Sequence, residues 1–67
     1  MAILKVLEIL ASSPTSWEDA AQEAVKEAAK TVRDIRSVNI QNQSAVVENG
    51  KITAYRLNCK ITFGVDR

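Results

Sequence analysis

The stretch Ser13-Pro14-Thr15-Ser16-Trp17-Glu18-Asp19, with the alanine-rich segment that follows it, decides the fold of this chain. Ser16 is the expected N-cap of a helix, because its hydroxyl can accept a hydrogen bond from an amide of the first turn. Asp19 stands three residues later and can take the place of the glutamate in a capping box. From there to near Ile35, apolar side chains recur at three- and four-residue steps, which predicts one amphipathic helix. Its apolar stripe consists of Trp17, Ala20, Ala21, Ala24, Val25, Ala28, Val32 and Ile35.

Three other segments have the composition of β-strands. Residues 2–11 are aliphatic on both faces, so we expect one face to meet the helix and the other to meet a neighbouring subunit. Residues 37–47 alternate, with Val38, Ile40 and Val46 on an apolar face and Ser37, Asn39, Gln41 and Gln43 on a polar one. Residues 52–65 have the most regular pattern, and one face carries Thr53, Tyr55, Leu57, Cys59, Ile61, Phe63 and Val65.

The last two strands are joined by Glu48-Asn49-Gly50-Lys51, in which Asn-Gly readily takes the positive φ angles of a type I′ turn. The predicted fold is therefore of the α+β class with the order β-α-β-β. It consists of a three-stranded antiparallel sheet packed on one helix. We expect residues 1–67 to form a single domain.

The chain is too small to bury a large core by itself. A chain of about 60 residues buries only about 60% of the surface that it exposes when unfolded. The 67 residues include one cysteine and no histidine, which excludes a disulfide within the chain and a Cys/His zinc site. Oligomerisation is the remaining means of stabilisation, so we expect a homo-oligomer.

The charge pattern excludes several classes of partner. The formal net charge is +1 with both signs interspersed, which does not predict nucleic-acid binding. No apolar run is long enough for a membrane span, and Lys5 and Glu8 interrupt residues 1–11, which we interpret as a strand rather than a signal peptide. A cytoplasmic protein with a reduced thiol is expected.

Catalysis is not expected from these residues. Cys59 lies on an apolar strand face, and the chain has no histidine to activate it. Four carboxylates offer oxygen ligands to a cation such as calcium. They do not form a contiguous loop motif, so the sequence does not decide whether a metal binds. They are Glu8, Asp34, Glu48 and Asp66.

Several of these features occur together, in order, in one known family. They are Lys5-Val6 with its short apolar strand, Ser12-Ser13 before the helix, the alanine-rich helix, and the strand with Tyr55 and Phe63. In these features the chain resembles the dodecins over nearly its whole length. The resemblance implies a hollow homododecamer that binds a small molecule, commonly a flavin such as FMN or riboflavin.

The departures from that family fall on the flavin site. The resemblance places the flavin-site positions at Ser37, Gln43, Val46 and Arg56. Ser37 stands where a tryptophan stacks on the flavin, Arg56 stands where a glutamine bonds the ring edge, and Val46 replaces a glutamate. Stacking on a base is worth roughly 1–3 kcal/mol, so its loss weakens flavin binding about tenfold or more. The guanidinium of Arg56 can instead stack on a ring or hold a phosphate.

Two functional hypotheses follow from this reasoning. The first is a dodecin-like homododecamer that binds or stores a small ligand, with flavin binding weak or altered. The alternative is a structural or regulatory oligomer that binds a cation such as calcium, an anion or a protein partner. Arg56 and Lys60 form either a solvated face with salt bridges or a ring of positive charge around a pocket. For Trp17 we favour a core residue covering the end of the sheet over a ligand platform.

Overall fold

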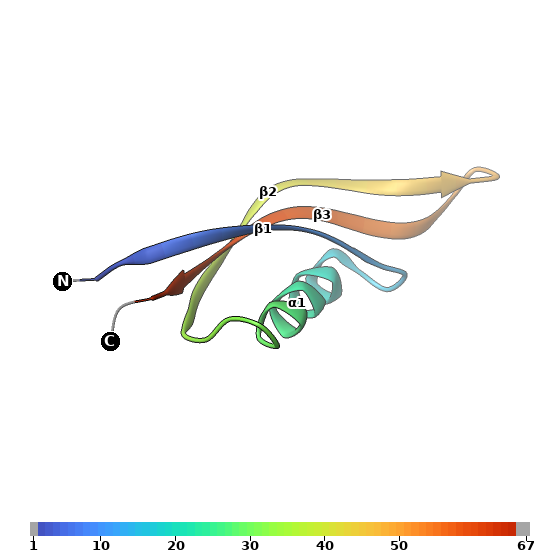
Figure 1. Ribbon diagram of the computed structural model, residues 1–67. Helices are drawn as coiled ribbons and strands as arrows, with labels where there is room; N and C mark the ends of the chain where they lie inside the picture. Colours follow the sequence, from blue (N-terminus) through green and yellow to red (C-terminus); the bar gives the residue numbers. More distant parts are fainter. Residues whose placement is uncertain (1, 66–67) are drawn as a thin grey trace.

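The computed structural model describes residues 2–65 as one sheet and one helix (Figure 1). The elements are β1 (Leu4–Ser13), α1 (Trp17–Ala28), β2 (Ile35–Glu48) and β3 (Lys51–Gly64). All strands pair in an antiparallel manner in the order β1-β3-β2, so β3 is the central strand. This arrangement confirms the predicted α+β fold. The β2–β3 hairpin extends past α1, and the molecule is correspondingly elongated, with extents of 51 × 19 × 13 Å.

The start of α1 is capped as the sequence predicts. The Ser16 hydroxyl accepts a hydrogen bond from the amide of Asp19 at 3.0 Å. Asp19 does not complete a capping box, however, because its carboxylate accepts a 2.6 Å hydrogen bond from the hydroxyl of Ser13. The same hydroxyl accepts the amide of Thr15 at 2.9 Å and that of Ser16 at 3.4 Å. Buried Ser13 therefore ties the end of β1 to the first turn of the helix.

The end of α1 was predicted wrongly, since the helix stops at Ala28 rather than near Ile35. The amides of Thr31 and Val32 both bond the carbonyl of Ala28, at 3.0 and 2.9 Å, which closes a terminal turn. Asp34 then takes a φ of 59°, a left-handed conformation that ends helical propagation. Val32 and Ile35 still pack on the core. The helical spacing of apolar residues in the sequence therefore extends beyond Ala28, where the helix itself ends.

The core lies between α1 and β3. On the helix, Ala20, Ala24 and Ala28 are buried, and their small side chains bring the helix close to the sheet. On β3 the buried side chains are Leu57, Cys59 and Ile61, which belong to the face predicted from the alternation. Three partly buried side chains of β1 pack against the core cluster. They are Leu7, Ile9 and Ala11.

The β2–β3 turn also agrees with the prediction. Asn49 and Gly50 have φ angles of 52° and 74°, as a type I′ turn requires. The turn pairs Glu48 with Lys51 and so sets the register at the hairpin end. Among the described residues, no helix is long and apolar enough to cross a membrane.

A bulge in β2 overturns part of the predicted alternation. Ile40 pairs with Cys59, but the next pair is Asn42 with Asn58, so Gln41 is an extra residue. Because directly paired residues share a face of the sheet, the alternation of β2 changes phase there. Gln43 lies opposite Leu57 on the helix side, and Val46 lies opposite Ala54 on the face turned away from α1. We call that second face the outer face.

Candidate functional site

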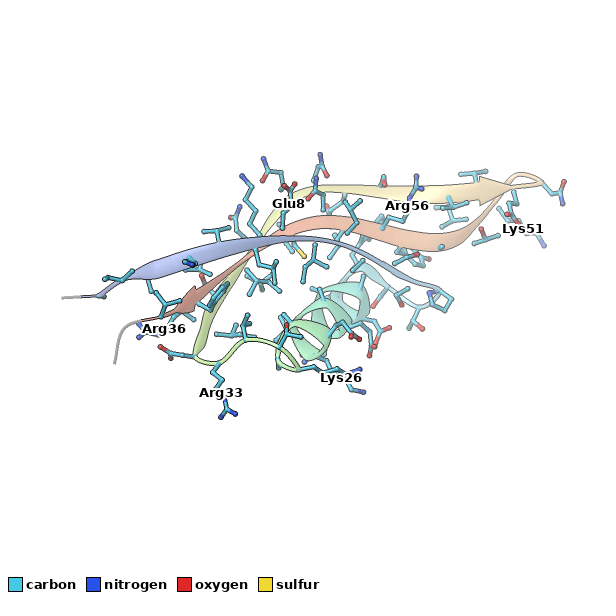
Figure 2. All side chains as sticks on the ribbon, in the orientation of Figure 1. Glu8, Lys26, Arg33, Arg36, Lys51 and Arg56 are labelled. Atoms are coloured by element: carbon cyan, nitrogen blue, oxygen red, sulfur yellow. The ribbon has the colours of Figure 1, made fainter. Side chains whose placement is uncertain are left out.

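Two neighbouring rows of side chains cross all three strands on the outer face. One row consists of Ser12, Arg56 and Ser44, and the next consists of Leu10, Asn58 and Asn42. Together with Ala11 and Leu57 they line a groove of about 310 Å³, which we call the outer groove. That volume is at the lower end of the range of small-molecule sites. Figure 2 shows Arg56 pointing away from the helix, on the same side as Glu8.

Among residues 2–65, the outer groove combines a cation that forms no ion pair with an acceptor that has no donor. The ion pairs among residues 2–65 join Glu27 to Lys30 and Asp34 to Arg36, so no described carboxylate neutralises Arg56. The side-chain oxygen of Asn58 is buried and has no hydrogen-bond partner in the described part of the chain. A buried acceptor without a donor costs free energy, so a ligand that donates to it gains affinity.

The walls of the outer groove indicate what it can hold. A guanidinium presents a planar fork of donors that matches carboxylate and phosphate oxygens. The amides of Asn42 and Asn58 can donate or accept, and the hydroxyls of Ser12 and Ser44 can do the same. Leu10 is 78% exposed and provides an apolar wall.

The four predicted flavin-site residues do not meet within one copy of the chain. Ser37 pairs with Thr62, six residues along β3 from Arg56, which corresponds to roughly 20 Å at about 3.3 Å per residue. Val46 shares the outer face with both but lies toward the hairpin. Gln43 is on the opposite face. A small ligand that touches both Ser37 and Arg56 therefore has to lie between copies.

Gln43 instead borders a second groove on the helix side of the sheet. This groove has a volume of about 390 Å³ and is lined by Trp17, Glu18, Ala21, Ile40, Gln43 and Leu57. The ring of Trp17 packs edge-on against Tyr55 with 4.8 Å between centroids, and its indole N–H donates to the carbonyl of Ser44 at 3.0 Å. Half-buried Trp17 thus holds the helix start against the sheet, but it lies outside the buried core cluster that the favoured interpretation expected it to join.

The titratable groups of the described residues are spread over the two faces of the sheet. The Cys59 thiol is buried, burial raises its pKa, and it donates to the carbonyl of Ile9 at 3.5 Å. Within residues 2–65, no three histidine, cysteine or acidic side chains lie close enough together to hold a metal. Asp34 pairs with Arg36 at 2.9 Å, and Glu8 lies on the outer face opposite Lys60. Asp66 lies outside the described residues.

Three lining residues of the outer groove were missed from the sequence. Leu10 was placed on one of the two apolar faces of its strand without a choice between them, and Ser12 and Ser44 carried no signal of their own. Their place depends on the register between strands. The turn at Asn49 sets that register, and an irregularity between Val46 and Val47, where Thr53 of β3 is skipped, shifts it before the groove is reached. Cross-strand register of this kind cannot be deduced from one strand's pattern.

The comparisons with known proteins agree on the family. The sequence model of the Dodecin family matches residues 3–66. The calcium dodecin of Mycobacterium tuberculosis is 45% identical over 64 residues, which cover 94% of this chain and 89% of that protein. The crystal structure of calcium dodecin, described as a calcium-chelating antigen with a calcium-binding site, superposes with a TM-score of 0.82 at 42% identity. It covers 96% of this chain and 91% of its own.

More distant structures show the same fold. A dodecin from Streptomyces coelicolor has a TM-score of 0.92 at 21% identity and covers 98% of this chain and 94% of its own. A variant of the Thermus thermophilus dodecin has a TM-score of 0.93 at 19% identity and covers all of both chains. With a family match over residues 3–66 and a relative at 45% identity, the chain belongs to the dodecin family.

Proposed function

We propose that this chain forms a homo-oligomer that binds a small ligand between its copies, and that it is a binding or storage protein rather than an enzyme. The observation that carries the proposal is the apolar outer face. Leu4, Val6 and Leu10 of β1 are 48%, 59% and 78% exposed in one copy. Glu8 interrupts this row, but three large exposed apolar side chains on one face of a strand are typical of an interface.

Assembly also fits the size of the chain. A single copy buries a small core of alanines and three β3 side chains, and short chains of this kind are marginal alone. Family membership supports a dodecamer, which for a 7.4 kDa chain has a mass of about 89 kDa (12 × 7.4). The reduced, buried thiol of Cys59 fits a cytoplasmic location.

Light scattering after gel filtration tests the assembly. The wild-type chain is expected at about 89 kDa (12 × 7.4). Val6→Asp places a charge on the outer face and should shift the mass toward that of one or a few copies, because a buried unpaired charge is costly. Gln22→Asp introduces the same charge on the exposed side of α1 and should leave the mass unchanged. A wild-type monomer would contradict the proposal.

Flavin is one candidate ligand, and we expect it to bind weakly. Ser37 cannot stack on a ring, so the affinity loses the contribution of an aromatic partner. A fluorescence titration of riboflavin against the purified oligomer measures what remains. The double variant Ser37→Trp with Arg56→Gln should bind riboflavin about tenfold more tightly or better. No gain in an intact oligomer would mean that these positions do not line the flavin site.

Calcium is the second candidate, and the 45% identity to a calcium dodecin favours it. Its oxygen ligands would come from more than one copy, with Glu8 as the outer-face carboxylate that assembly can multiply. Calorimetric titration of the chelator-treated oligomer with calcium, and with magnesium as the control, tests this function. Bound calcium should also raise the melting temperature, since a ligand that binds only the folded state stabilises it. Equal, non-saturating responses to both ions would contradict calcium binding.

A further inference from the structure

We infer that the outer groove is a site for a small organic oxyanion, a phosphate monoester or a carboxylate on an apolar body, which Arg56 holds through its guanidinium. This inference rests on the proposed small-ligand function and names the class of ligand. It concerns the part of that site which one copy supplies, the groove formed by the rows of Arg56 and Asn58. It therefore does not depend on the position of Ser37.

The first step is the charge of Arg56. The side chains beside it on the same row are the hydroxyls of Ser12 and Ser44, and those of the next row are the amides of Asn58 and Asn42 with Leu10. None of these carries a negative charge, and no described carboxylate forms an ion pair with Arg56. The groove therefore presents a net positive field, which favours an anion over a metal cation at this place.

The second step is the hydrogen-bonding capacity next to that charge. Asn58 lies two residues from Arg56 on the same face of β3, and no described residue donates a hydrogen bond to its buried side-chain oxygen. Two residues along a strand correspond to roughly 7 Å. A ligand with an oxyanion at Arg56 and an N–H or O–H group about that far away would satisfy both groups at once. An inorganic ion alone would leave Asn58 unsatisfied.

The third step is the apolar wall. Leu10 stands at the edge of the groove next to Asn58, and the 310 Å³ volume exceeds what an inorganic ion needs. Small-molecule sites typically join apolar walls to a few polar groups that fix orientation. The combination of Leu10, Asn58 and Arg56 therefore indicates an organic anion rather than free phosphate.

Riboflavin and FMN form a matched pair of probes, because they differ by one phosphate. Both are titrated by fluorescence quenching against the oligomer at low salt. We expect FMN to bind about tenfold more tightly than riboflavin, which corresponds to about 1.4 kcal/mol. High salt should reduce the ratio, because salt screens exposed charges. Phosphate and acetate, at equal ionic strength, are then added as competitors to separate a phosphate preference from a carboxylate preference.

Arg56→Gln should bring the ratio of the two affinities to about one, and Arg56→Lys should keep part of the preference. Arg33→Gln is the matched control, since it removes the same charge from the loop after α1, on the helix side of the molecule (Figure 2). Equal binding of both flavins by the wild type, or no binding of FMN at millimolar concentration, overturns the inference. So does a preference that survives in Arg56→Gln or disappears in Arg33→Gln.

Light scattering on the same samples separates this inference from the proposed function. An intact wild-type oligomer without FMN preference overturns the anion site and leaves the assembly standing. A wild-type monomer contradicts the proposed function itself. If Arg56→Gln dissociates the oligomer, Arg56 is an interface residue that pairs with another copy, and the anion site is wrong.

Discussion

The face of the sheet that carries α1 leaves Cys59 and Ile61 with no exposed surface, whereas the outer face leaves Val6 and Leu10 mostly in solvent. The first face is completed by the chain's own helix. The second face has exposed apolar side chains that no other part of the chain covers within residues 2–65. The charged and polar groove at Arg56 lies on the same face. One face is therefore buried within a single copy, and the other is the face on which we propose that copies and ligands bind.

The division is not complete on the helix side. Figure 1 shows α1 lying across β1 and β3, with the far part of the β2–β3 hairpin beyond it. Val38 and Ile40 of β2 face the helix side but remain 36% and 40% exposed. The uncovered edge at β2 is therefore a second surface on which assembly can bury apolar area.

Truncation of a core side chain should produce the largest effect. Ile61→Ala removes a fully buried side chain between β3 and α1, and such changes cost about 2–5 kcal/mol through lost burial and the cavity left behind. Urea unfolding followed by circular dichroism measures the loss. We expect it at every protein concentration, because the contact lies within one copy.

Val6→Ala is the counterpart on the outer face. Its effect should depend on protein concentration, because the Val6 side chain loses contacts only where copies meet. Similar losses for both variants, independent of concentration, would contradict the distinction between the two faces.

A smaller effect is expected from the contact that joins the helix start to the hairpin. Trp17→Phe keeps a ring against Tyr55 but removes the N–H that donates to the carbonyl of Ser44. A typical hydrogen bond contributes about 0.5–1.5 kcal/mol, so the free energy of unfolding should fall by about 1 kcal/mol. Chemical denaturation compared with Tyr55→Phe, which preserves both rings, gives the control. A loss as large as that of Ile61→Ala would mean that Trp17 is part of the main core.

Much of the helix face could be predicted because its signals are local. The alternation of β3 identified Leu57, Cys59 and Ile61 as buried, and the hydroxyl of Ser16 marked the helix start. The helix end was missed for a physical reason. Val32 and Ile35 continue the apolar spacing because the returning chain packs on the same core, although the backbone has already left the helix.

The outer groove was harder to predict because it depends on pairing between strands. Arg56 was identified from the resemblance to the dodecins, but its neighbours Ser12 and Ser44 come from the other two strands. The extra residue Gln41 changes which side chains of β2 face outward, and it moves Gln43 to the helix side. Nothing in the alternation of residues 37–47 marks that bulge, so the polar face was assigned as if the strand were regular.

The smallest effect is expected where the chain leaves the helix layer and enters β2. Exposed Asp34 accepts two 2.9 Å hydrogen bonds from Arg36, and these bonds hold the pKa of its carboxyl below the ordinary value of 3.8. A carboxyl with a lowered pKa stabilises the folded state above its unfolded pKa, and this contribution is lost as the pH falls through the folded value. Asp34→Asn should therefore destabilise the protein slightly at neutral pH and not at strongly acidic pH.

The substitution isolates the charge, because asparagine also tolerates the left-handed φ of 59° at this position. Urea unfolding of both proteins, at neutral pH and at a series of values below about pH 4, measures the difference in stability. The difference should also shrink in high salt, since the pair is exposed. A difference that stays constant down to strongly acidic pH would mean that Asp34 acts through its backbone turn. The ion pair would then contribute nothing to the junction between the helix layer and the sheet.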